Sequence, residues 1–121
     1  MDLHPINIKN KLRLFSAYWS PKIIAQMNDY DFKIAKIQGD FVWHSHPETD
    51  ETFIVIHGKM QIHLRESAVN LNEGEMLVIP KGVEHKPFAQ EECHILLIEM
   101  AGTVNTGNIK SPKTIESSEW I

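Results

Sequence analysis

Two histidines separated by one residue, His44 and His46, give the strongest chemical signal in the sequence, within the run WHSHPETDE. Side chains alternate between the two faces of a β-strand, so both imidazoles would point to the same side of an extended segment. Two imidazoles at this spacing can coordinate one metal ion. Pro47 then forces a turn, which sends the chain back toward the acidic residues that follow.

A carboxylate on the returning strand can supply an oxygen to the same ion. Glu51 is the first residue of an apolar run, and strand alternation puts its side chain on the same face as those of Phe53 and Val55. We therefore favour Glu51 over its neighbour Asp50 as the ligand. Glu48, in the turn between the two strands, is a third and weaker candidate.

A second cluster supplies one more imidazole. Turn-forming residues occur between Gly74 and Gly82, and His85 follows them at the start of a predicted strand. Three histidines and one glutamate would leave coordination positions open, which distinguishes a catalytic metal from a closed structural one. Nitrogen and oxygen donors without thiolates suit Fe, Mn, Ni, Co, Cu or Zn. The candidate ligands of such a divalent transition metal are His44, His46, Glu51 and His85.

The candidate ligands lie within or beside short apolar runs, which must therefore position them. Gly, Pro or Asn-Asp interrupts the sequence every few residues and keeps these runs short. Many short strands with turn signals between them indicate an all-β sandwich or barrel. No long helical pattern interrupts them, which argues against a βαβ architecture. The predicted strands are residues 23–27, 31–38, 41–46, 51–57, 60–66, 68–71, 76–79, 84–88 and 94–99.

The two ends of the chain differ from this strand-rich middle. We expect one short helical turn within residues 12–19 and one capped helical turn within residues 114–120. The predicted organisation is an N-terminal arm at residues 1–30, a barrel at residues 31–100 and a C-terminal tail at residues 101–121. The tail is expected to pack on the barrel within a single domain.

Together, the two clusters resemble the two motifs of the cupin superfamily. The matching positions are Gly39, His44, His46, Glu51 and Gly58 in the first motif and Gly74, Pro80, Gly82 and His85 in the second. Within the superfamily, the chain resembles the small single-domain conserved-barrel proteins called mannose-6-phosphate isomerase-like. The resemblance implies a double-stranded β-helix, a jelly-roll barrel with short N- and C-terminal extensions, and it puts the three histidines and the glutamate at the metal-ligand positions.

Two positions depart from the motifs. Four residues separate Gly39 from His44 where five are usual, and Ala89 occupies a position that often holds Asn. Neither change removes a ligand.

Composition limits the partners of the chain. The 121 residues carry a formal charge of −4 and no basic cluster, which argues against nucleic acid as a partner. No uninterrupted apolar run exceeds four residues, whereas a membrane-spanning helix needs about 20. The N-terminal residues lack the apolar stretch of a secretory signal, and the single cysteine, Cys93, fits a reducing cytoplasm.

Two classes of function are compatible with these residues. The first is a metal-dependent enzyme, of isomerase or dioxygenase type, that acts on a small polar molecule, with Glu48 as a weak candidate for the base. The second is a non-catalytic module that binds a sugar or a small acid. We also expect a homodimer, because the segment before Asp31 carries more apolar side chains than a segment exposed to solvent would need. These residues are Phe15, Tyr18, Trp19, Ile23 and Ile24.

Overall fold

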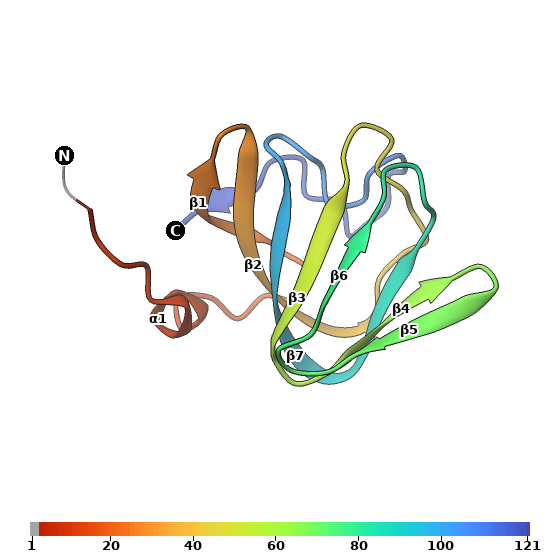
Figure 1. The fold of residues 1–121 in the computed structure, drawn as a ribbon, viewed down its shortest axis with the longest axis horizontal. Coiled ribbons are helices and arrows are strands. Elements are labelled where there is room, and N and C mark those ends of the chain that lie inside the picture. Colours follow the sequence, from red (N-terminus) through yellow and green to blue (C-terminus); the bar gives the residue numbers. More distant parts are fainter. Residues whose placement is uncertain (1–2) are drawn as a thin grey trace.

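The computed structural model describes residues 3–121, in which eight strands and one short helix are found (Figure 1). β-Branched and aromatic residues are frequent in the strands, where they fit a pleated and half-buried surface. The elements are α1 (Ile8–Leu12), β1 (Lys22–Met27), β2 (Tyr30–Asp40), β3 (Glu51–His57), β4 (Met60–Leu64), β5 (Ser67–Leu71), β6 (Met76–Ile79), β7 (Lys86–Met100) and β8 (Glu119–Trp120). The prediction of an all-β jelly-roll fold is confirmed.

The long strand β7 organises the sheet. The strand order is β5-β4-β7-β2-β1-β8, and β3 pairs with both β7 and β6. Residues 86–88 of β7 pair with β4, whereas residues 94–99 lie between β2 and β3. Because one strand changes partners along its length, the sheet curls around a core (Figure 1). Within residues 3–121, the hydrogen-bonded sheet curls without closing into a complete barrel.

Alternate side chains of β2, β3, β4 and β7 point inward and form the main hydrophobic core. Its buried members include Ala35, Ile37, Phe53, Val55, Ile62, Ile95 and Leu97. At one end of the sheet, the same inward-facing rows end in buried polar residues, Lys33 on β2, Glu51 on β3 and Glu99 on β7. The strand alternation that builds the core therefore also carries charged groups into the interior.

The outer face of the sheet is partly covered by the N-terminal segment. Leu12 of α1 packs with Ile24 of β1 and Ile34 of β2 in a second hydrophobic cluster. The chain then crosses to the inner side, where the Trp19 ring stacks on Phe41 with the ring centroids 4.8 Å apart. Much of the apolar surface near the N-terminus is thus buried against its own sheet.

The strand predictions were wrong in two places. Residues 41–46 form no strand, and only the isolated bridge between His44 and His85 replaces it, because the backbone of Ser45 bonds to Asn108 of the tail. The predicted strands 84–88 and 94–99 are one continuous strand, β7, which bends where its pairing with β2 and with β3 shifts register.

The tail and the N-terminal helix also differ from expectation. Residues 114–118 contain a bend and no helical turn, and residues 119–120 form β8, which pairs parallel with β1. The helix near the N-terminus begins earlier than predicted, at Ile8, where the side chain of Asn7 accepts a hydrogen bond from the Asn10 amide and caps the first turn.

Candidate metal centre

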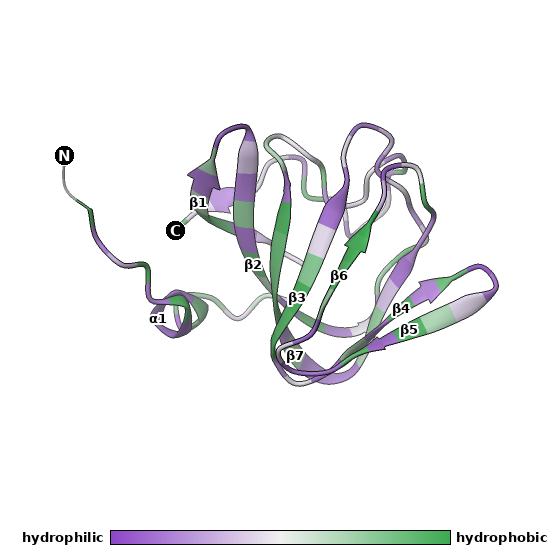
Figure 2. Ribbon diagram, viewed as in Figure 1, coloured by the Kyte–Doolittle hydropathy of each residue, from purple (hydrophilic) through white to green (hydrophobic). Residues whose placement is uncertain are grey.

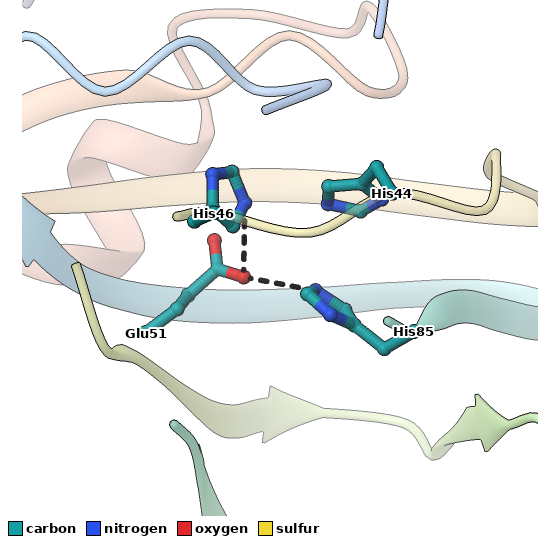
Figure 3. Close-up of side chains that lie close together, drawn as sticks. All are labelled: His44, His46, Glu51 and His85. Carbon is teal, nitrogen blue, oxygen red and sulfur yellow. Dashed lines mark hydrogen bonds and ion pairs between the residues drawn. The ribbon is translucent and has the colours of Figure 1, made fainter. Parts of the chain in front are cut away.

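Three separate segments bring the candidate ligands together. His44 and His46 lie on the segment after β2, Glu51 begins β3, and His85 directly precedes β7 (Figure 3). The His44 and His85 segments are joined by reciprocal backbone hydrogen bonds of 3.1 and 2.9 Å. All four side chains are buried.

The four side chains converge closely enough to surround one ion. Each residue offers a ligand atom, and these atoms all lie within 4.8 Å of one another. Glu51 Oε1 is 3.2 Å from His85 Nε2 and 3.5 Å from His46 Nε2 (Figure 3). The two sequence motifs predict this grouping, and the cluster has the composition and spacing that could hold a metal ion.

The two alternative carboxylates lie outside the cluster. Asp50 is exposed, and its Oδ1 accepts a hydrogen bond of 2.8 Å from the backbone amide of Lys81. Glu48 is also exposed and lines a separate surface depression beside His46. The alternation of side chains along β3 thus puts Glu51 in the interior and its neighbour Asp50 at the surface.

Backbone carbonyls fix the orientation of two imidazoles. His44 Nδ1 is 2.9 Å from the Val42 carbonyl oxygen, and His85 Nδ1 is 2.9 Å from that of Val83. A carbonyl can only accept, so each Nδ1 must carry the proton and donate it. The Nε2 lone pairs then face the centre of the cluster, which is the usual arrangement of histidines that ligate metals.

His46 provides the test of whether the residues fit a metal ion. Its Nε2 is buried and makes no hydrogen bond within the described chain. Buried polar atoms without partners are rare in folded proteins and call for an explanation such as an ion or a water molecule. Three imidazole nitrogens and one carboxylate, without thiolates, form a donor set suited to divalent transition metals. The residues therefore fit such an ion.

The electrostatics of the cluster favour a cation. Burial, assisted by the nearby His85, lowers the pKa of His44 to about 4, so its imidazole is neutral at pH 7. Burial opposes ionisation of Glu51, but the adjacent imidazoles of His46 and His85 outweigh it and hold the pKa of Glu51 well below the usual range. A neutral imidazole and an ionised carboxylate are the forms that bind metals.

The low pKa of His44 predicts that the metal-free protein loses stability in acid. The unfolded chain takes up a proton near pH 6.5, whereas the folded chain resists it until about pH 4. Falling pH therefore favours unfolding across this window, by about 3 kcal/mol between pH 7 and pH 4. Urea unfolding at both pH values should show a smaller loss in His44→Gln than in the wild type. An equal loss in the two proteins would contradict the prediction.

A small cavity of about 40 Å³ adjoins the cluster. Most of its wall is apolar, and its polar groups come from His44, Glu51, Glu99 and Asn105. Trp19 forms part of the wall with a φ of 57°, a left-handed conformation that is strained for a bulky residue. Since a water molecule needs about 10–15 Å³, the cavity has room for a few waters or for the coordinating end of a small ligand.

The C-terminal tail positions the histidine segment, which sequence reasoning missed. The amide of Ser45 donates to Asn108 Oδ1 at 2.9 Å, and the amide of Asn108 donates to the Ser45 carbonyl at 3.0 Å. Gly107 lies directly against the Ser45 carbonyl and His46 Nδ1. The run Thr106-Gly107-Asn108 signals a turn, but nothing in the sequence shows which segment that turn contacts.

The chain is an all-β jelly roll whose interior holds three histidines and a glutamate that could bind a metal ion. Residues 32–99 match the family model described as a cupin domain. The chain therefore belongs to the cupin family.

Curated relatives match part of the chain. The uncharacterized protein YdbB of Bacillus subtilis (strain 168) is 40% identical over 65 residues, which cover 52% of this chain and 57% of YdbB. An uncharacterized protein of Aquifex aeolicus (strain VF5) is 39% identical over 54 residues, which cover 45% of each chain. The chain thus spans about half the length of the curated relatives it matches.

Solved structures match more of the chain. A cupin-2 domain protein from Shewanella frigidimarina is 57% identical, with a TM-score of 0.78, covering 78% of this chain and 93% of that one. Protein NMB1881 from Neisseria meningitidis is 33% identical, with a TM-score of 0.74, covering 81% of this chain and all of that one. Both comparisons support the cupin assignment.

Proposed function

We propose that the protein is a metal-dependent enzyme in which His44, His46, Glu51 and His85 hold a divalent transition metal. The observation that carries the proposal is the buried His46 Nε2, which makes no hydrogen bond within residues 3–121 and faces Glu51 beside two anchored imidazoles. When bound, the ion would polarise a carbonyl or hydroxyl as a Lewis acid, or supply redox chemistry if it is iron. The reaction would be of isomerase or dioxygenase type.

The surrounding residues would select and orient a small molecule. Trp19, Phe41 and Phe53 form an apolar wall of the cavity. Glu99 is the carboxyl group that lines the cavity together with Glu51. We infer a compact ligand whose polar end reaches the ion and whose remainder contacts the apolar wall. Glu48, the base suggested by the sequence, lines a different depression and is a poorer candidate for proton transfer here.

A non-catalytic module that binds a small ligand is the second candidate function. The mainly apolar cavity wall favours it, because few groups near the cluster can transfer protons. Such a module would use the ion, or only the cavity, to hold a sugar or a small acid. The narrower likeness to mannose-6-phosphate isomerase-like cupins stays a prediction.

Metal analysis of protein purified without an affinity tag tests the proposed function. One equivalent of bound metal per chain is expected. Iron would favour oxygen chemistry, whereas zinc or manganese would favour isomerisation or hydrolysis. Failure to bind any of the six candidate divalent ions, tested individually at micromolar concentration, would overturn the proposal.

A reducing, cytoplasmic location also stays a prediction. Cys93 is buried, and burial raises the pKa of its thiol to about 11, which suits an unreactive cysteine. Among residues 3–121, the structure has no helix that is both long and apolar enough to span a membrane.

We predict that the chain forms a homodimer in solution. Ile23 and Ile24 are buried in their own subunit, but Leu3 and Leu14 remain 85% and 64% exposed on the projecting N-terminal arm (Figure 1). β3 and β6 are hydrophobic over much of their length (Figure 2), and the outward-facing Met76 of β6 is 57% exposed. Such exposed apolar surface usually marks an interface. Sedimentation at micromolar concentration should show twice the 13.9 kDa chain mass, and a single monomeric species would contradict the prediction.

A further inference from the structure

A buried ion pair lies beside the candidate metal centre. Lys33 Nζ is 3.1 Å from Glu99 Oε1, and both side chains are only 2% exposed. The next inward-facing residues toward the core are apolar. They are Ala35 on β2, two positions from Lys33, and Leu97 on β7, two positions from Glu99. Burying two charges carries a large desolvation penalty, so the core alone does not account for them.

Strand register connects this ion pair to Glu51. Glu51 and Glu99 are directly paired across β3 and β7. Directly paired side chains have Cβ atoms about 5 Å apart, so the two carboxyl groups meet on the inner face of the sheet. Both also line the cavity beside His44.

The second oxygen of Glu99 points to the role of the pair. Glu99 Oε2 is buried and receives no hydrogen bond from a donor in the described chain. Lys33 therefore anchors one oxygen of Glu99, and the rest of the Glu99 side chain lies beside the directly paired Glu51.

Lys33 is itself held in place. Its Nζ donates to the Thr103 carbonyl at 3.2 Å in addition to Glu99. Hydrogen bonds therefore join Lys33 to the tail and to Glu99, and Glu99 lies next to Glu51 across the paired strands. Glu51 in turn contacts two of the imidazoles.

We propose that Lys33 and Glu99 are positioning residues that hold the Glu51 carboxylate toward the three imidazoles. The inference rests on the proposed metal-binding function and adds two residues that lie outside the predicted ligand set. Partners that orient a metal ligand commonly contribute 10–100-fold, roughly, to metal affinity. We expect a loss of this size when either residue is changed.

The test compares variants of the full chain by Zn²⁺ affinity, measured in competition with a chelator, and by the absorption spectrum of the Co²⁺-loaded protein. Lys33→Met and Glu99→Gln should each weaken Zn²⁺ binding by about 10–100-fold and alter the Co²⁺ spectrum. Glu92→Gln is the matched control, because Glu92 lies on the same strand but bonds to Tyr18 and His94 at the surface. Its Zn²⁺ affinity should equal that of the wild type.

A double variant separates positioning from stability. Lys33→Met with Glu99→Leu replaces the ion pair by apolar side chains, a change that buried ion pairs often tolerate. The thermal stability of the metal-free double variant should recover relative to Lys33→Met, while its Zn²⁺ affinity stays about 10–100-fold low.

Wild-type affinity in Glu99→Gln or in the double variant would overturn the positioning role alone. Absence of Zn²⁺ and Co²⁺ binding in the wild type would instead overturn the proposed metal site, and the positioning role with it. Should the double variant fail to fold, Glu99→Gln, which preserves the side-chain shape, decides the question.

Discussion

Replacing Glu51 by alanine is expected to weaken divalent-metal binding by more than about 100-fold, because loss of a residue that only orients a ligand already costs about 10–100-fold. Glu51 Oε1 approaches the Nε2 atoms of His46 and His85, so no other carboxylate in the cluster can substitute for it. His44→Ala and His85→Ala should likewise remove most bound metal. Chelator competition measures the affinity, and circular dichroism should show unchanged β-structure.

Asp50→Ala is the control for this experiment. Asp50 is adjacent in sequence, but its side chain is exposed and caps the Lys81 amide outside the cluster. We expect it to retain metal binding close to that of the wild type. If Asp50→Ala loses more metal than Glu51→Ala, or if the histidine variants remain fully occupied, the assignment of ligands is wrong.

Gly107→Ala is expected to have the largest effect on stability. Gly107 has a φ of 56°, and a Cβ placed there would overlap the Ser45 carbonyl oxygen and lie 3.1 Å from His46 Nδ1. The left-handed backbone costs an alanine about 1–2 kcal/mol, and forced backbone shifts cost about 1–3 kcal/mol more. Urea unfolding should therefore show a loss of about 3 kcal/mol, with weaker metal binding because His46 moves.

Gly102→Ala is the matched control for Gly107→Ala. Gly102 has a φ of 85°, but a Cβ there would meet nothing within 4 Å. The free energy of unfolding of Gly102→Ala should fall only by the cost of the left-handed backbone, about 1–2 kcal/mol. The metal affinity of this variant should match that of the wild type. Similar losses of stability and metal binding in the two variants would show that the tail does not position His46.

Several features followed from local pattern. Alternation along the strand put Glu51 inside and Asp50 outside, and the structure agrees, with Glu51 5% exposed and Asp50 at the surface. Turn signals around Gly58 and Gly74 separated strands that the structure also separates. These predictions succeed because side-chain alternation and the positive φ of glycine are properties of a few neighbouring residues.

Other features failed or were missed because they depend on distant segments. The run 41–46 has the composition of a strand, but its backbone groups bond to several separate segments and not to one partner strand. These partners are Pro87 of β7, Gly82, His85 and Asn108. Trp19 was expected at a dimer interface, yet it lines the cavity against Phe41. Nothing in the local sequence around residues 41–46 or around Trp19 reveals these partners.

Local sequence pattern was enough to predict the all-β class, the cupin motifs and the four residues that converge at the candidate metal centre. Spacing within a strand or turn is enough for this, because it sets the face on which each side chain lies. The positions of Lys33 and Glu99 behind Glu51, and of Gly107 against Ser45, are visible only in the folded chain. The paired residues Lys33 and Glu99, Glu51 and Glu99, and Ser45 and Gly107 are between 48 and 66 positions apart, and strand register and tail packing, which arise only on folding, bring them together.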